Sequence, residues 1–187
     1  RTGERTMCER IDVYVDDNFS IPTFVFAPSE SQSAPRPAIL WNPGWPQSKY
    51  IPSYQKFAGR MAAQGFVVLI PDHIPFGETS YPDGKEGSSM TLAMGMGNVL
   101  GYSQLAVRAM ETMRCGEYLR SREDVDENLV IVAGLCQGGQ DTWLSAALDD
   151  GFCAAAPLCS ASTFGVHFSE MALYRANADA SPFPFGI

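Results

Sequence analysis

Histidine is scarce in this sequence, with only His73 and His167 among 187 residues. Basic side chains are also few: 13 lysines and arginines stand against 21 aspartates and glutamates, which gives a formal net charge of -8. No stretch gathers a continuous basic run, so none could neutralise a nucleic-acid backbone or an anionic bilayer. We therefore expect neither a nucleic acid nor a membrane surface as a partner.

Long apolar runs and paired cysteines are missing too. The longest apolar runs, at 65–71 and 129–136, fall far short of the roughly 20 residues that a membrane-spanning helix needs, and we expect no secretory leader. The cysteines are odd in number and form no CxxC pair, which argues against a disulfide framework and a Cys-rich zinc site; they are Cys8, Cys115, Cys136, Cys153 and Cys159. The expectation is a protein of the reducing cytoplasm that holds no metal.

The composition describes one globular domain over residues 1–187. Hydrophobic residues make up 45% and charged residues 18% of the sequence, as in soluble folded proteins, and the length suffices for a sizeable core. Neither an internal repeat nor a linker divides the chain. It begins at Arg1 and closes on the proline-rich segment 181–187, from which we expect that both ends are trimmed.

The first half of the sequence alternates between strand and helix patterns. Segments 10–15 and 20–27 alternate apolar with polar residues around an Asp-Asp-Asn turn, which predicts an antiparallel hairpin. Short apolar runs at 37–42 and 65–70 predict two buried strands. Between them, 50–64 has helical periodicity and is followed by Gly65, a residue typical of helix C-caps.

The second half continues the alternation after a long break. Residues 72–97 are rich in Gly, Ser, Met and Pro and predict a functional loop, a wall or lid of a pocket. Helical spacing over 98–122, an apolar strand at 129–133, a helix at 139–148 and a buried strand at 153–159 follow. Apolar strands that alternate with helices predict an α/β fold with a mostly parallel sheet covered on both faces.

The strand at 129–133 runs directly into Gly134-Leu135-Cys136-Gln137-Gly138-Gly139 and then a helix. This is the strand, elbow and helix context of the G-x-S-x-G motif, with sulfur in place of oxygen. Gly134 and Gly138 allow strand and helix to approach closely, and the helix N-terminus favours a negative charge beside Cys136. The pattern makes Cys136 the candidate nucleophile; the alternative is an inert cysteine in a tight turn.

The chain resembles the α/β-hydrolases, and within them the dienelactone hydrolase and acetyl xylan esterase-like group. The elbow at 134–139 is similar to the dienelactone hydrolase elbow, with cysteine as nucleophile and a second glycine after the motif. The turn Asn42-Pro43-Gly44-Trp45 stands where the group has its His-Gly oxyanion turn, and 71–80 is similar to its D-x-x-G-x-G-x-S segment. The resemblance covers about residues 10–160 and implies an α/β-hydrolase fold.

The resemblance also implies roles for individual residues. The oxyanion hole would consist of the backbone N–H groups of Gln137 and Trp45, although Trp45 could instead be an aromatic cover over the core. From the residues themselves we expect a substrate pocket near the carboxyl ends of the strands, with Gly44, His73, Phe76, Met94 and Met96; for the methionines the alternative is core filling. Asp141 and Asp149 are expected to be solvent or capping residues. Asp72 and Glu78 are expected to have structural roles in a turn, and the alternative is that they set the protonation of the thiol.

The resemblance has one large departure. In this superfamily the acid and the histidine follow the nucleophile on later strands, and the chain stops before such strands could form. His167 is therefore only a possible base, with a loop residue as the alternative. We expect the fold to be incomplete at its C-terminus and to be completed by a second polypeptide or C-terminal fragment that carries Asp and His.

The expected activity is acyl transfer from a small-molecule ester, thioester or lactone to Cys136, followed by hydrolysis or by transfer to another acceptor. The alternative is an inactive hydrolase-like binding or scaffold protein. No cofactor is expected, because the glycines at 95–101 lack both the spacing of a dinucleotide loop and a preceding strand.

Overall fold

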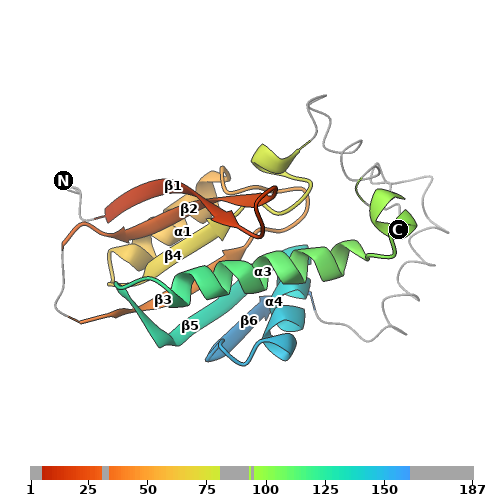
Figure 1. Cartoon of the computed structure of the whole chain (residues 1–187). Helices are drawn as coiled ribbons and strands as arrows, with labels where there is room; N and C mark the ends of the chain where they lie inside the picture. The colour runs from red at the N-terminus through yellow and green to blue at the C-terminus, as the bar shows by residue number, and fades with distance from the viewer. Residues whose placement is uncertain (1–5, 31–33, 81–92, 94, 161–187) are drawn as a thin grey trace.

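A computed structural model describes residues 6–30, 34–80, 93 and 95–160. Its centre is a six-stranded sheet in the order β1-β2-β4-β3-β5-β6 (Figure 1). The strands are β1 Thr6–Tyr14, β2 Ser20–Pro28, β3 Arg36–Asn42, β4 Val67–Pro71, β5 Val125–Leu135 and β6 Ala154–Leu158. The helices are α1 Pro52–Ala62, the short 3-10 helix η1 Gly77–Thr79, α3 Gln104–Arg120 and α4 Gln137–Leu148.

The predicted hairpin is confirmed and lies at one edge of the sheet. Strand β1 pairs antiparallel with β2, and β2 pairs antiparallel with β4. Asp16 fixes the turn, because its Oδ1 accepts from the amides of Asn18 at 2.8 Å and Phe19 at 2.9 Å. Strands β4, β3, β5 and β6 run parallel, so their carboxyl ends share one edge of the sheet.

Alternate residues of the parallel strands supply two cores, one on each face of the sheet. On β3, Ala38 and Leu40 pack in the core that α3 covers, whereas Ile39 and Trp41 pack against α1. The same alternation holds along β4 and β5. Helices therefore cover both faces, as the continuous apolar strands predicted, with α1 on the face opposite α3 (Figure 1).

Helix α3 begins six residues later than the sequence pattern suggested. Residues 95–99 form a separate helical turn, and the chain then turns at Gly101, whose φ is +81°. The hydroxyl of Ser103 caps the new helix by accepting from the amide of Ala106 at 3.1 Å. The expected loop thus ends earlier than residue 97, and the glycine and the cap set the start of α3 at Gln104.

Strand β6 is correctly placed but is not the buried strand that its apolar sequence predicted. Ala154, Ala155 and Ala156 are exposed, and Leu158 is 44% exposed. The reason is position: β6 lies at the end of the sheet and, among the described strands, pairs only with β5. An apolar edge strand with one open side is therefore the outer boundary of this part of the molecule.

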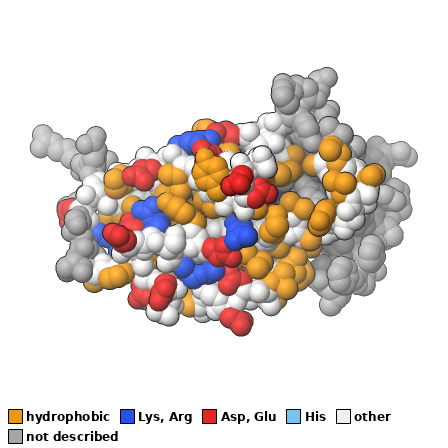
Figure 2. Space-filling view, viewed as in Figure 1, with side chains coloured by type: hydrophobic (Ala, Val, Ile, Leu, Met, Phe, Trp, Pro, Cys, Tyr) orange, Lys and Arg blue, Asp and Glu red, His pale blue; other side chains and the backbone are white. Residues whose placement is uncertain are grey.

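The surface divides by type of side chain. Figure 2 shows charges of both signs interspersed over the face that carries α3, while hydrophobic atoms gather towards one end. Met96, Val99, Leu100 and Tyr102 are among the exposed apolar side chains of the described residues. No helix in the described ranges combines the length and apolar character needed to cross a bilayer.

Candidate active site

The elbow at the end of β5 has the geometry that its sequence predicted. Cys136 has φ 57° and ψ -118° and stands at the N-cap position of α4. A non-glycine residue is strained in this region of backbone space, and such strain is found preferentially at functional sites. Cys136 is exposed, so the inert buried cysteine considered from the sequence does not describe it.

Glycines surround Cys136 because the backbone segments there touch. A Cβ atom on Gly138 would lie 2.1 Å from the carbonyl oxygen of Asn42, and one on Gly134 would lie 2.3 Å from that of Gly138. A Cβ on Gly139 would lie 2.5 Å from Oγ of Ser160. Any larger residue at one of these three glycine positions would therefore push α4 away from the end of β3, β5 or β6.

The Gly44 turn lies directly beside the elbow. A Cβ on Gly44 would be 3.5 Å from Cβ of Cys136. The Gly44 amide donates to the hydroxyl of Tyr54 at 3.3 Å, and that hydroxyl donates to the side chain of Gln47. Burial raises the pKa of Tyr54, and negative charge on Cys136 raises it further, so the phenol remains a donor. Tyr54 thus holds the turn next to the thiol.

Helix α4 begins immediately after Cys136, so the first amides of the helix belong to the residues next to the thiol. The carbonyl of Cys136 accepts from Gly139 at 3.0 Å and from Gln140 at 3.2 Å. The amides of Gln137 and Gly138 therefore precede the first intrahelical bonds, and such N-terminal amides favour negative charge. Of the two predicted oxyanion donors, Gln137 directly follows Cys136, and Trp45 directly follows Gly44 in the turn beside the elbow.

A buried ion pair joins these segments to α3. Arg108 donates to Oδ2 of Asp141 from Nε at 2.9 Å and from Nη2 at 2.6 Å, and its Nη2 also lies 3.3 Å from the carbonyl oxygen of Pro43. Both side chains are at most 1% exposed. The expectation that Asp141 is a solvent or capping residue was wrong, because α3 covers this face of α4.

A chain of hydrogen bonds below the elbow can be followed from the carbonyl of Gly138. Thr142 donates its only hydroxyl proton to this oxygen at 2.7 Å, so it must accept from Nδ2 of Asn42 at 3.2 Å. The other amide atom, Oδ1 of Asn42, then faces Nε2 of His73 at 2.9 Å as an acceptor. It follows that Nε2 of His73 carries a proton.

The remaining ring nitrogen of His73 faces a carboxyl group. Nδ1 lies 2.8 Å from Oε2 of Glu111, and Oε1 of Glu111 accepts from the amide of Ile74 at 3.4 Å. Burial lowers the pKa of His73 to about 3, and burial raises the pKa of Glu111 to about 8. The charge of Arg108 also lowers the pKa of His73. The proton in this contact is therefore carried by Glu111, which donates it to Nδ1 of His73, and the pair is uncharged near neutral pH.

Of the residues predicted to line the pocket or to act as the base, some are buried, one is exposed and two lie outside the described residues. His73 is 2% exposed with both nitrogens engaged, and Phe76 is 1% exposed under Arg108, so neither presents a surface to a ligand in this arrangement. Met96 is 49% exposed on the short helical turn. Met94 and His167 lie outside the described residues.

The loop after β4 is fixed by the turn carboxylates that the sequence suggested. Oδ1 of Asp72 accepts from the amide of Lys49 at 2.8 Å, and Oδ2 accepts from the amide of Glu78 at 2.9 Å and from the fully buried Nζ of Lys49. Gly77 is required here, since its φ is +61° and a Cβ would lie 2.1 Å from Oδ2 of Asp72. These bonds make Asp72 a structural residue.

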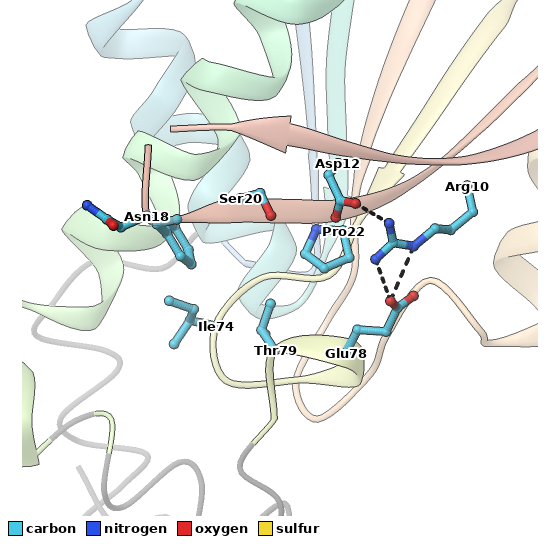
Figure 3. A pocket seen from close by; sticks show the side chains of 9 residues that line it. Arg10, Asp12, Asn18, Ser20, Pro22, Ile74, Glu78 and Thr79 are labelled. Atoms are coloured by element: carbon cyan, nitrogen blue, oxygen red, sulfur yellow. Dashed lines mark hydrogen bonds and ion pairs between the residues drawn. The ribbon is translucent and has the colours of Figure 1, made fainter. Parts of the chain in front are cut away.

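A shallow hollow lies between the hairpin and this loop (Figure 3). Within it, Arg10 binds Oε2 of Glu78 from Nη2 at 2.7 Å and also contacts Asp12. The bond from Arg10 lowers the pKa of Glu78 to about 2. Strands β4 and β3 separate β2 from β5 in the sheet, so the hollow is a different place from the elbow.

No group of three or more His, Cys, Asp or Glu residues in the described part of the chain is arranged to hold a metal ion. The described site comprises the Cys136 thiol, the first backbone amides of α4 and a buried polar network. Several members of this network were not identified from the sequence: Asn42, Tyr54, Arg108, Glu111 and Thr142. They come from β3, α1, α3 and α4, and apart from Asn42, which belongs to the Gly44 turn, no local motif marks them.

A parallel sheet with helices on both faces and a strained elbow between the fifth strand and its helix define the class as the α/β-hydrolase fold. The model of the dienelactone hydrolase family matches residues 21–170. The chain therefore belongs to the dienelactone hydrolase family.

Individual relatives agree with this assignment. YtaP of Bacillus subtilis (strain 168), described as a hydrolase, is 28% identical over 104 residues, which are 56% of this chain and 33% of YtaP. A structure from Bacteroides fragilis NCTC 9343, described as an acetyl xylan esterase, has a TM-score of 0.70 at 19% identity over 81% of this chain and 44% of its own. The structure of methylesterase BT1017 has a TM-score of 0.69 at 21% identity. The match covers 87% of this chain and 34% of that protein.

The chain thus spans less than half the length of each of these three proteins. At the identities of the two solved structures, the likeness establishes the fold and nothing about a substrate.

Two helical glycines provide a matched test of the close contact at the elbow. Gly138→Ala places a methyl group against the backbone of β3, so we expect a loss of about 1–3 kcal/mol of unfolding free energy and slower alkylation of Cys136. Gly59→Ala, in α1, meets nothing within 4 Å and should be neutral or stabilising by up to about 1 kcal/mol. Urea unfolding and iodoacetamide labelling measure both; equal effects at the two sites would contradict the contact.

The His73–Glu111 pair predicts a specific dependence of stability on pH. In the folded state His73 is neutral above about pH 3 and Glu111 keeps its proton up to about pH 8. In the unfolded state Glu111 loses its proton near pH 4.5, and His73 loses its second ring proton near pH 6.5. The contribution of this pair to the free energy of unfolding should therefore rise with pH up to pH 4.5 and stay level to pH 6.5. Between pH 6.5 and pH 8 it should fall by about 2 kcal/mol.

Glu111→Gln keeps a donor towards Nδ1 but cannot ionise, so it should remove the decline above pH 6.5. The surface variant Glu117→Gln should retain that decline. Urea unfolding at several pH values distinguishes them, and an unchanged decline in Glu111→Gln would show that the carboxyl group is not the source.

Proposed function

We propose that the chain carries the nucleophile of an acyl-transfer enzyme that acts on a small carboxylic ester, thioester or lactone. The thiol of Cys136 attacks the carbonyl carbon, and the alcohol or thiol leaves from an acyl-cysteine, which water or another acceptor then cleaves. The observation that carries the proposal is the exposed Cys136 thiol on a left-handed elbow at the N-terminus of α4.

Oxyanion stabilisation is assigned to the backbone N–H groups of Gln137 and Trp45. The first belongs to the N-terminal amides of α4, which already favour negative charge. The second belongs to the turn that lies beside Cys136 and is held there by Tyr54 and Arg108. Tyr54 and Arg108 fix the Gly44 turn, and the close contact of Gly138 with Asn42 fixes the first turn of α4. The donors therefore need little reorganisation as charge develops on the substrate oxygen.

The general base is proposed to come from outside the described residues. His73 is the one histidine among them, and its nitrogens are committed to Asn42 and Glu111 in the interior. His167 or a histidine of a second polypeptide would supply the imidazole, with an Asp to orient it. The open apolar edge of β6 favours a completing segment, since uncovered edge strands of this kind are rare in isolated proteins.

Substrate choice is assigned to the segment after the Asp72 loop. This segment follows the loop at Asp72, which accepts a hydrogen bond from Lys49. It leads to the helical turn at 95–99, near which Met96, Val99 and Leu100 are exposed. These side chains suit an acyl group or ring with an apolar component. Two of the structural relatives are named as an acetyl xylan esterase and a methylesterase, and both names concern carboxylic esters.

The first test removes the thiol. Cys136→Ala should abolish the burst of p-nitrophenol from p-nitrophenyl acetate and reduce turnover by about 10³-fold or more, because nucleophile and acyl-enzyme are lost together. Cys153→Ala, at an equally exposed thiol, should leave both unchanged. Retention of the burst in Cys136→Ala would refute the assignment, and absence of any burst from the parent chain together with its completing segment would favour an inactive scaffold.

The second test concerns the completing segment. Native mass spectrometry of material purified without denaturant should detect the 20.4 kDa chain together with further polypeptide mass, and turnover should follow that complex. A well-folded 20.4 kDa monomer with full turnover would refute the need for a second polypeptide and direct attention to His167.

A further inference from the structure

Two exposed cysteines stand at the carboxyl ends of adjacent strands. The parallel register pairs Leu135 of β5 with Leu158 of β6, so Cys136 and Cys159 are the next residues on each strand. The amide of Cys136 donates to the carbonyl of Leu158 at 2.9 Å, which keeps the strands together up to this point. Both cysteines have free thiols.

The backbone sets these two residues apart from the rest of the described chain. Within that part, Cys136 and Cys159 are the non-glycine residues with positive φ, at 57° and 52°. The elbow explains this conformation for Cys136, but the sheet does not require it of Cys159. The turn after β6 also packs on the first turn of α4, where a Cβ on Gly139 would lie 2.8 Å from the carbonyl oxygen of Leu158.

The spacing of the two residues suits a covalent link. Neighbouring strands lie about 4.8 Å apart, and disulfides join residues whose Cα atoms are about 4.4–6.8 Å apart. No other described cysteine has this position. Cys153 precedes β6 and so lies at its opposite end, Cys8 is on β1 at the far edge of the sheet, and Cys115 is buried in the core.

We propose that Cys159 is the resolving partner of Cys136 in a reversible thiol–disulfide switch driven by a hydroperoxide. The proposal rests on Cys136 being the reactive thiol of the proposed function. Oxidation would stop acyl transfer, since the nucleophile is then bonded to Cys159. The same link would protect Cys136 from further oxidation to sulfinic acid, which thiols do not reverse.

The chemistry balances in two steps. The Cys136 thiolate attacks one peroxide oxygen, the O–O bond breaks, and a sulfenic acid and an alcohol or water form. The Cys159 thiolate then attacks the Cys136 sulfur, the S–O bond breaks, and water leaves as the disulfide forms. Two thiols have lost two electrons and two protons, and the hydroperoxide has accepted them. A dithiol restores both thiols by exchange.

The test is to treat the chain with hydrogen peroxide and map the thiols without reduction. No lysine or arginine lies between Arg122 and Arg175, so trypsin leaves Cys136, Cys153 and Cys159 on one peptide. Chymotrypsin, which can cut after Trp143, Phe152 and Leu158, separates them. We expect a Cys136–Cys159 linked peptide, and free thiols falling from five to about three per chain, with both changes reversed by dithiothreitol.

Matched variants make the result specific. In Cys159→Ser, dimedone should trap a sulfenic acid at Cys136, and prolonged peroxide should give sulfinic acid that dithiothreitol does not reverse. Cys153→Ser and Cys8→Ser should behave like the parent chain. Equal dimedone labelling of Cys136 in parent and Cys159→Ser, or a link from Cys136 to Cys153, would overturn the proposal.

The readout separates this proposal from the proposed function. The linked peptide is measured without any substrate, so its absence alongside an intact p-nitrophenol burst would refute the switch alone. A linked peptide in material that gives no burst even when the completing segment is present would refute the acyl-transfer role while supporting the thiol pair.

Discussion

The contact between the first turn of α4 and the end of β3 is the constraint on which the site depends. Gly138 lies so close to the carbonyl of Asn42 that no side chain fits between them. This approach brings the Gly44 turn and the N-terminus of α4 together at Cys136. The left-handed conformation of Cys136 is the local cost of so sharp a connection between strand and helix.

The same contact explains why polar groups are buried below the elbow. Asn42 and Pro43 at the end of β3 and Gly138 in the first turn of α4 are buried, so their carbonyls need partners within the protein. Thr142 and Asn42 satisfy part of this need, and Arg108 satisfies Pro43 while it binds Asp141. Breaking one member would leave another buried group unpaired, so the network acts as a unit.

Periodicity and turn residues were enough to predict the hairpin, the parallel strands and the elbow, because each of these is coded by neighbouring residues. The start of α3 was misplaced because a serine cap and a glycine turn divided one helical pattern into two helical segments. Exposure of β6 could not be foreseen, since composition does not reveal which strand is at an edge. The network of Asn42, Arg108 and Glu111 was missed because its members meet only through folding.

The shared proton between His73 and Glu111 has a consequence for electrostatics at the elbow. As long as that pair keeps the same two protons, its net charge stays at zero from about pH 3 to about pH 8. Arg108 and Asp141, paired in the interior, cancel each other beside it. The field that this network imposes on Cys136 therefore changes little below about pH 7 and becomes more negative as Glu111 ionises near pH 8. Below that point, a pH–rate profile of this site reports on other groups.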